Sequence, residues 1–172
     1  MTTSEPSRKQ ALRDALRGGE LRALQILQLA LMLGVSLFAA VVLALAVVAR
    51  SAETGDALPA ATLRTLSIVH AALAAFAWGL GPLLQSLMLR QGAPGPTLGP
   101  LAALRQATLT RLALLEAPAI LGLVICLLAQ RGGVIAAQPL YWLNALSAVA
   151  FVAYGALSFP TQARVEERLN GV

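Results

Sequence analysis

Four long runs of apolar side chains are the feature that most restricts how this chain can fold. They cover about residues 21–49, 66–89, 101–129 and 140–159. A helix needs about 20 mainly apolar residues to cross the hydrocarbon core of a bilayer. Only helices and closed barrels satisfy their backbone polar groups there. The sequence therefore predicts an all-α fold, an integral membrane four-helix bundle formed by residues 21–160.

The composition agrees with a protein whose main partner is the lipid bilayer. Hydrophobic residues make up 58% of the chain and charged residues only 12%, whereas soluble domains carry about a quarter charged residues. The basic residues stand at the ends of the apolar runs and do not alternate with aromatics, which argues against nucleic-acid binding. One histidine and one cysteine cannot build a zinc site. We therefore expect no metal, no cofactor and no enzymatic activity.

The distribution of the 13 basic residues predicts the orientation of the bundle. Ten lie within residues 8–22, within residues 90–111 or after the fourth run, and three lie in the other two connections. Because Lys and Arg are enriched on the cytoplasmic side, both termini are expected in the cytoplasm (N-in/C-in). The first run is longer than the apolar part of a cleaved signal peptide. The arginine- and alanine-rich composition suggests the inner membrane of a bacterium.

The two ends of the chain are expected to be cytoplasmic segments. Residues 1–20 place alanines and leucines at helical spacing between basic residues. This segment is either a short amphipathic helix on the anionic membrane surface or a solvated helical tail. Residues 161–172 are expected to form a second cytoplasmic tail.

Polar side chains from all four runs fall at one depth when residues are counted from the cytoplasmic ends. This predicted polar layer comprises Glu116, Gln85, Ser86, Tyr154 and Gln28. Pro82 and Pro118 lie beside it, and because each lacks an N–H donor they are expected to break their helices there. Paired breaks can mark a binding site in transporters, and prolines are also common in membrane helices. The polar layer is thus a candidate ion- or proton-binding site or a packing feature.

Two further groups of residues suggest contacts between helices. His70 and Asn144 lie near the outer side, where they form either an interhelical hydrogen bond or a proton entry. Ala71, Ala75 and Gly79 recur every four residues, a spacing that permits close helix approach. This small-residue stripe is expected to face a sister subunit or the first or third run.

The segment Ala113–Leu128, ALLEAPAILGLVICLL, resembles the carboxylate-bearing helix of the rotary ATPase proteolipid, the c subunit. That resemblance implies that Glu116 binds a proton or a sodium ion. The second run departs from the family, because it has only Gly79 and Gly81 where the family has a regular series of glycines. The whole chain also resembles small uncharacterised bacterial four-span membrane proteins, which supports the topology without supplying an activity.

Two functions are consistent with these features. In the first, the chain is a non-enzymatic structural or accessory subunit of a membrane assembly, as a homo-oligomer or within a larger complex. In the second, it is a proteolipid-like subunit that translocates protons or ions through Glu116. The two differ in whether the Glu116 carboxyl exchanges with the solution.

Overall fold

The described part of the chain is helical throughout. The computed structural model describes residues 19–48, 58–91 and 100–164, and no strand occurs among them. Three long helices are followed by a short helix, a 3-10 helix and a last helix. In order they are α2 (Glu20–Val48), α3 (Ala60–Gln91), α4 (Pro100–Arg131), α5 (Val134–Ala137), η2 (Pro139–Ala145) and α6 (Leu146–Leu157).

Four helical segments are long and apolar enough to cross a membrane, as the sequence predicts. They are Leu21–Val48, Ala60–Met88, Arg105–Arg131 and Pro139–Leu157. The predicted amphipathic segment (residues 1–20) and the predicted tail (residues 161–172) lie outside the described residues, apart from residues 19–20 and 161–164.

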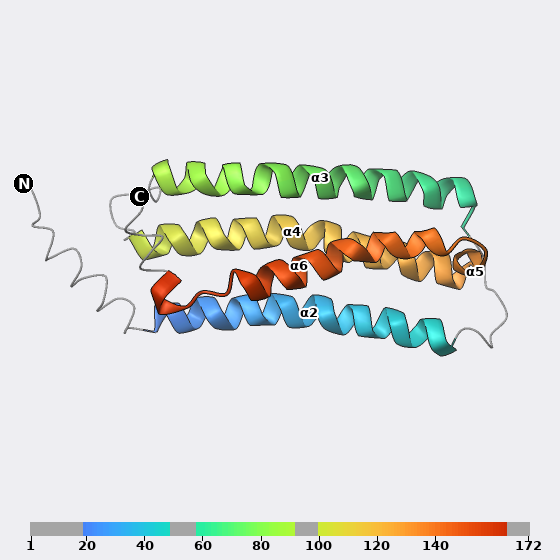
Figure 1. The fold of residues 1–172 in the computed structure, drawn as a ribbon, viewed down its shortest axis with the longest axis horizontal. Coiled ribbons are helices and arrows are strands. Elements are labelled where there is room, and N and C mark those ends of the chain that lie inside the picture. Colours follow the sequence, from blue (N-terminus) through green and yellow to red (C-terminus); the bar gives the residue numbers. More distant parts are fainter. Residues whose placement is uncertain (1–18, 49–57, 92–99, 165–172) are drawn as a thin grey trace, which may run out of the picture.

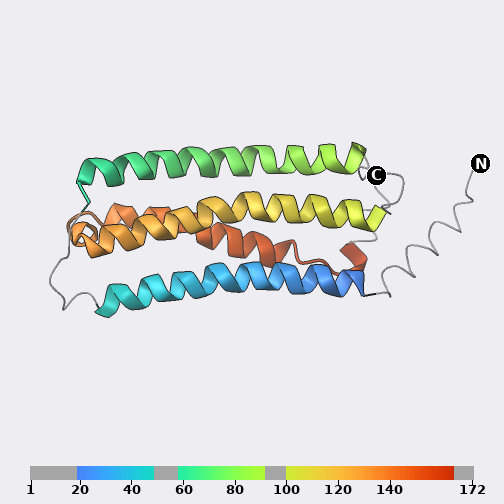
Figure 2. The same ribbon diagram turned by 180° about the vertical axis from the view of Figure 1, so that it is seen from behind.

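The long helices lie side by side, with α4 in contact with all the others (Figure 1). α3 packs along α4 on one side, and α2 and α6 pack against α4 and against each other. The view from behind shows α4 between α3 and α2 (Figure 2). The start of α2 and the end of α6 lie at one end of the molecule, and α5 lies at the other, which we call the α5 end.

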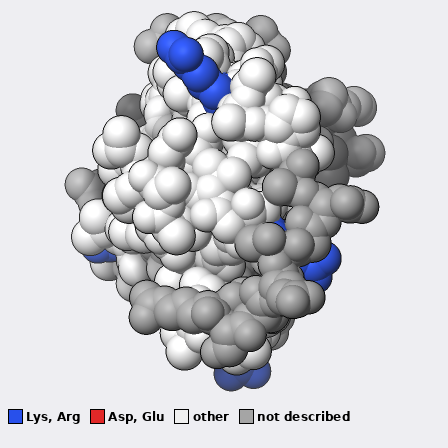
Figure 3. Space-filling view, turned by 90° about the vertical axis from the view of Figure 1, so that its right-hand side faces the viewer, with Lys and Arg blue, Asp and Glu red and all other residues white. Residues whose placement is uncertain are grey.

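The buried core is small and apolar, and the outer faces are apolar as well. Leu112, Leu115 and Phe151 are among the most deeply buried side chains. Large apolar side chains are exposed along α2, α3 and α6, as expected where lipid replaces water. The end-on view of the α5 end shows scattered basic side chains and no acidic side chain on its described surface (Figure 3).

Two glycines permit the closest approaches between helices. A Cβ on Gly122 of α4 would lie 2.1 Å from the carbonyl oxygen of Asn144. A Cβ on Gly155 of α6 would lie 2.7 Å from the Sδ atom of Met32 in α2. A residue without a side chain is therefore needed where α4 meets the fourth span, whereas at Gly155 the flexible Met32 side chain can shift.

The expected helix breaks at Pro82 and Pro118 are wrong. α3 continues through Pro82 and α4 through Pro118. Each proline removes one N–H donor, but leaving the helix in an apolar surrounding would strand several more backbone groups.

Helix ends also differ from the expected spans. α3 begins at Ala60, six residues before the expected start, so Arg64 lies within the helix. The fourth span begins as the 3-10 helix η2, which the apolar pattern did not indicate. The turn between α4 and α5 contains Gly133 at a positive φ of 67°, a conformation that glycine adopts without strain.

Candidate functional site

The first candidate site is a buried hydrogen-bonded group between α3, α4 and the fourth span, which we call the His70 cluster. It consists of Ser67, His70, Asn144 and Ser147. His70 Nδ1 lies 3.0 Å from Asn144 Oδ1, so the expected contact between these residues is present. His70 Nε2 lies 3.0 Å from Ser147 Oγ. The Asn144 amide nitrogen donates to Ser67 Oγ (3.1 Å) and to the Tyr141 carbonyl (2.9 Å).

The hydrogen-bond pattern fixes one proton of the imidazole and leaves the other optional. Because the Asn144 amide nitrogen faces two acceptors, its oxygen faces His70 and must accept a proton from Nδ1. The Ser147 hydroxyl lies 3.0 Å from the Pro118 carbonyl and 2.9 Å from the Asn144 carbonyl. It can donate to Nε2 of a neutral ring, or donate to a carbonyl and accept from a charged ring. The cluster therefore hydrogen-bonds both protonation states of His70.

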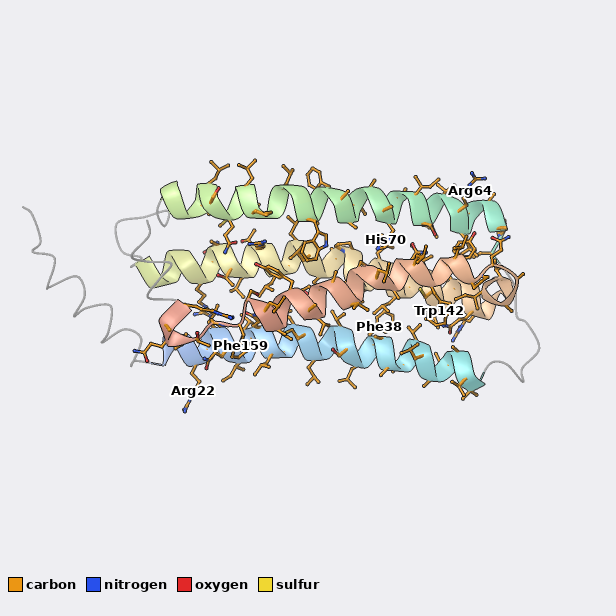
Figure 4. The ribbon with its side chains drawn as sticks, viewed as in Figure 1. Arg22, Phe38, Arg64, His70, Trp142 and Phe159 are labelled. Atoms are coloured by element: carbon orange, nitrogen blue, oxygen red, sulfur yellow. The ribbon has the colours of Figure 1, made fainter. Side chains whose placement is uncertain are left out.

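A groove opens beside this cluster between α3 and the fourth span. Its volume is about 860 Å³, and His70, Asn144 and Ser147 are among its lining residues. Figure 4 shows His70 between these elements and Arg64 further toward the α5 end of α3. A volume of this size lies within the range of about 300–1,000 Å³ that small-molecule sites occupy.

The second candidate site surrounds Arg111, and we call it the Arg111 cluster. Arg111 Nη1 donates to Gln85 Oε1 at 2.6 Å. The guanidinium carbon lies 4.5 Å from the centre of the Tyr154 ring, a cation–π geometry. Trp78 meets the same ring edge-on, with centroids 5.7 Å apart. The cluster links α3, α4 and α6 around a cation.

The predicted polar layer does not gather around Glu116. Gln85 and Tyr154 come together on Arg111, whereas Ser86 bonds within its own helix to the Leu83 carbonyl. Gln28 Nε2 donates to the Gly155 carbonyl at 2.7 Å.

Glu116 itself is half-buried and has no hydrogen bond or ion pair to any described residue. Five residues separate it from Arg111, a rotation that places their side chains about 140° apart around α4 at 100° per residue. Counting residues along the sequence therefore gives the depth of a side chain in the membrane but not the side of the helix on which it lies.

Sequence reasoning missed Arg111, Ser67 and Ser147. Arg111 contributed to the predicted orientation of the bundle, whereas in the structure it lies within α4 and its side chain contacts Gln85 and Tyr154. The two serines stand three residues from His70 and Asn144 respectively, a spacing that puts side chains on one helix face. That spacing was the signal available in the sequence.

The small-residue stripe packs on neither α2 nor α4. Ala71, Ala75 and Gly79 are all exposed, and a Cβ on Gly79 would meet open space. Ala71 lines the groove. The stripe is therefore not buried against the first or third span, and a contact with a sister subunit stays a prediction.

Gln130 provides a test of buried polarity, because both polar atoms of its amide are buried without a partner among the described residues. A buried polar group without a partner costs about 1–3 kcal/mol. We therefore expect Gln130→Met to raise the unfolding midpoint in detergent, measured by circular dichroism. Gln28→Met is the control and should lower it, because the Gln28 amide donates to Gly155. A lower midpoint for Gln130→Met would show that a partner outside the described residues satisfies this amide.

Chemically, the two clusters offer one protonatable imidazole and one fixed cation, each held by side chains of this chain. Glu116, the acidic side chain of α4, stands apart from both. Comparisons with protein-family models, with curated proteins and with solved structures found no match to this chain.

Proposed function

We propose that this chain is a non-enzymatic structural or accessory subunit of an assembly in a bacterial inner membrane. In this proposal its four spans form an N-in/C-in bundle, and Glu116 pairs with a group from another chain. The observation that carries the proposal is the position of Glu116, which is half-buried and without a hydrogen bond or ion pair to the described residues.

The depth of Glu116 makes an unpaired carboxyl costly. It lies 11 residues from Arg105, the first residue of the candidate span Arg105–Arg131, which is about 16 Å along a helix. That is close to half of a hydrocarbon core about 30 Å thick. Ionisable side chains at such depth almost always pair with another polar group or face a water-filled cavity.

The surroundings of Glu116 favour a partner from another chain. Ala113, Ala117 and Ile120 are exposed, and at their spacing they share a helix face with Glu116. The other described helices therefore leave that face of α4 open, as an apolar strip with a carboxyl near its centre. A second copy or another membrane protein with a hydrogen-bonding side chain would complete it.

The same open face favours a second candidate function, proton or ion translocation. A carboxyl that none of the described residues holds is free to exchange a proton or an ion. The resemblance of Ala113–Leu128 to the proteolipid helix supports this alternative. It requires the carboxyl to be reachable from the solution, whereas an accessory subunit requires it to be covered.

Carbodiimide labelling of Glu116 separates the two functions. For an accessory subunit we expect little labelling in native membranes at any pH, and strong labelling once detergent has separated the subunits. The variant Glu116→Gln keeps the shape and hydrogen bonding of the side chain, so it should assemble normally and give the unlabelled baseline. Labelling in intact membranes that titrates near neutral pH, or that sodium blocks, would overturn the accessory role and establish an exchangeable carboxyl.

A further inference from the structure

The groove between α3 and the fourth span has its own polarity gradient. At the α5 end it is lined by Arg64, Ser67 and Gln138, and at the other end by Ala74, Trp78 and Ala150. The 14 residues from Arg64 to Trp78 span about 21 Å of helix. The gradient matches an amphiphile lying along the helices, with its polar part at the α5 end.

The groove is long and open on one side. Its volume of about 860 Å³ extends over about 21 Å of helix. Extended hydrocarbon chains can lie along a groove of this length.

The groove opens sideways onto the apolar surface of the molecule. α3 packs on α4 and contacts η2, whereas it meets α6 through a few side chains such as His70 and Trp78, so the two walls do not close over the groove. Ile68 on one wall and Leu143 and Leu146 on the other are 62%, 57% and 59% exposed. A molecule dissolved in the bilayer can enter directly, without passing through water.

A cation without a partner stands at the polar end. Arg64 is exposed and makes no hydrogen bond or ion pair with the described residues. Arginine binds phosphate through paired, charge-assisted hydrogen bonds. The charge of Arg64 and the polarity gradient of the groove together favour a lipid with an anionic head group.

From these features we infer that the groove binds one anionic phospholipid, with its phosphate at Arg64 and its acyl chains running past His70 to Trp78. Glu116 does not line the groove, so this inference stands or falls separately from the proposed function. The bound lipid would lie beside the His70 cluster, with its head group on one side of the cluster and the ends of its acyl chains on the other.

Native mass spectrometry of the purified full-length chain with added phosphatidylglycerol tests the inference. We expect one retained lipid per chain, and about tenfold weaker retention of phosphatidylcholine, because its choline ammonium offsets the phosphate charge and brings a second cation close to Arg64. Ala74→Leu fills the groove and should abolish retention. Ala75→Leu is the matched control, since Ala75 is exposed on the same helix but does not line the groove. Ala150→Leu fills it from the opposite wall should Ala74→Leu fail to fold.

The role of the Arg64 charge is tested by the same measurement of lipid retention. Arg64→Gln should remove the preference for phosphatidylglycerol, whereas Arg131→Gln, an exposed arginine that does not line the groove, should leave it intact.

In bilayers, acyl-brominated phosphatidylglycerol should quench Trp78 fluorescence in a Trp142→Phe background, and Ala74→Leu should prevent this. Equal retention by all variants would overturn the inference. A dimer lost only in Ala74→Leu, without bound lipid, would assign the groove to a second copy of the chain.

Discussion

Gly122→Ala is expected to prevent this protein from folding to its native packing. The added Cβ would lie 2.1 Å from the Asn144 carbonyl oxygen, 2.7 Å from Ser147 Oγ and 2.9 Å from His70 Nε2. A backbone oxygen cannot rotate away as the end of a side chain can, so the fourth span would have to move off α4. Overpacking of a core commonly costs about 1–3 kcal/mol and occasionally more, and this contact belongs at the upper end. Loss of monodisperse protein in size-exclusion chromatography and a lower unfolding midpoint would report it.

Two other glycines provide matched controls for this substitution. Gly155→Ala meets the flexible Met32 side chain, whose thioether can shift, so about 1 kcal/mol or less is expected. Gly79→Ala meets open space and should be neutral or slightly stabilising, because alanine favours helix more than glycine does. If Gly122→Ala behaves like Gly79→Ala, the close approach of α4 to the fourth span is not present in the membrane.

Gln85→Leu is expected to destabilise the protein by about 2 kcal/mol or more, because it leaves a partly buried charge without its acceptor. The Gln85 oxygen is 2.6 Å from Arg111 Nη1, and Arg111 Nε is already buried without a partner among the described residues. The guanidinium would keep only its contact with the Tyr154 ring. Unfolding in a denaturing detergent, followed by circular dichroism, measures the loss.

A double-mutant cycle isolates the Gln85–Arg111 interaction. Replacing both hydrogen-bonding partners with apolar side chains can be close to neutral, so Gln85→Leu combined with Arg111→Met should recover most of the stability that Gln85→Leu loses. Ser86→Leu is the neighbouring control, because Ser86 bonds only to its own helix and should have a small effect. Additive losses in the double variant would show that Arg111 and Gln85 act independently.

The number and approximate place of the spans could be read from the sequence because insertion depends on the length of an apolar run, which is a local property. The hydrogen bond between His70 and Asn144 could be anticipated because polar side chains at one depth in neighbouring helices seek each other. Depth alone did not identify the partner of Gln85. That requires the angle of each residue around its helix, which depends on how α3, α4 and α6 are rotated against one another.

The groove and the open face at Glu116 were beyond sequence reasoning for a related reason. Almost every outward position of α2, α3 and α6 is apolar, whether lipid or protein covers it, so the pattern of polarity does not show which helices meet. α3 packs closely on α4 and meets α6 through a few side chains. The approach of His70 and the fourth span to α4 depends on a residue as small as Gly122. A single glycine in an apolar run gives little indication of such a close approach.

The tight winding of η2 sets both the reach and the side-chain alignment of the fourth span. A 3-10 helix rises about 2.0 Å per residue against 1.5 Å in an α-helix, so the 19 residues Pro139–Leu157 extend about 32 Å. An all-α segment of the same length would fall about 3–4 Å short of that. Three residues per turn also superimpose side chains at every third position, which helps to align Tyr141 and Asn144 along one edge. The seven residues of η2 therefore determine two properties. They set how well the fourth span matches the thickness of its bilayer, and they align the groups that hold His70.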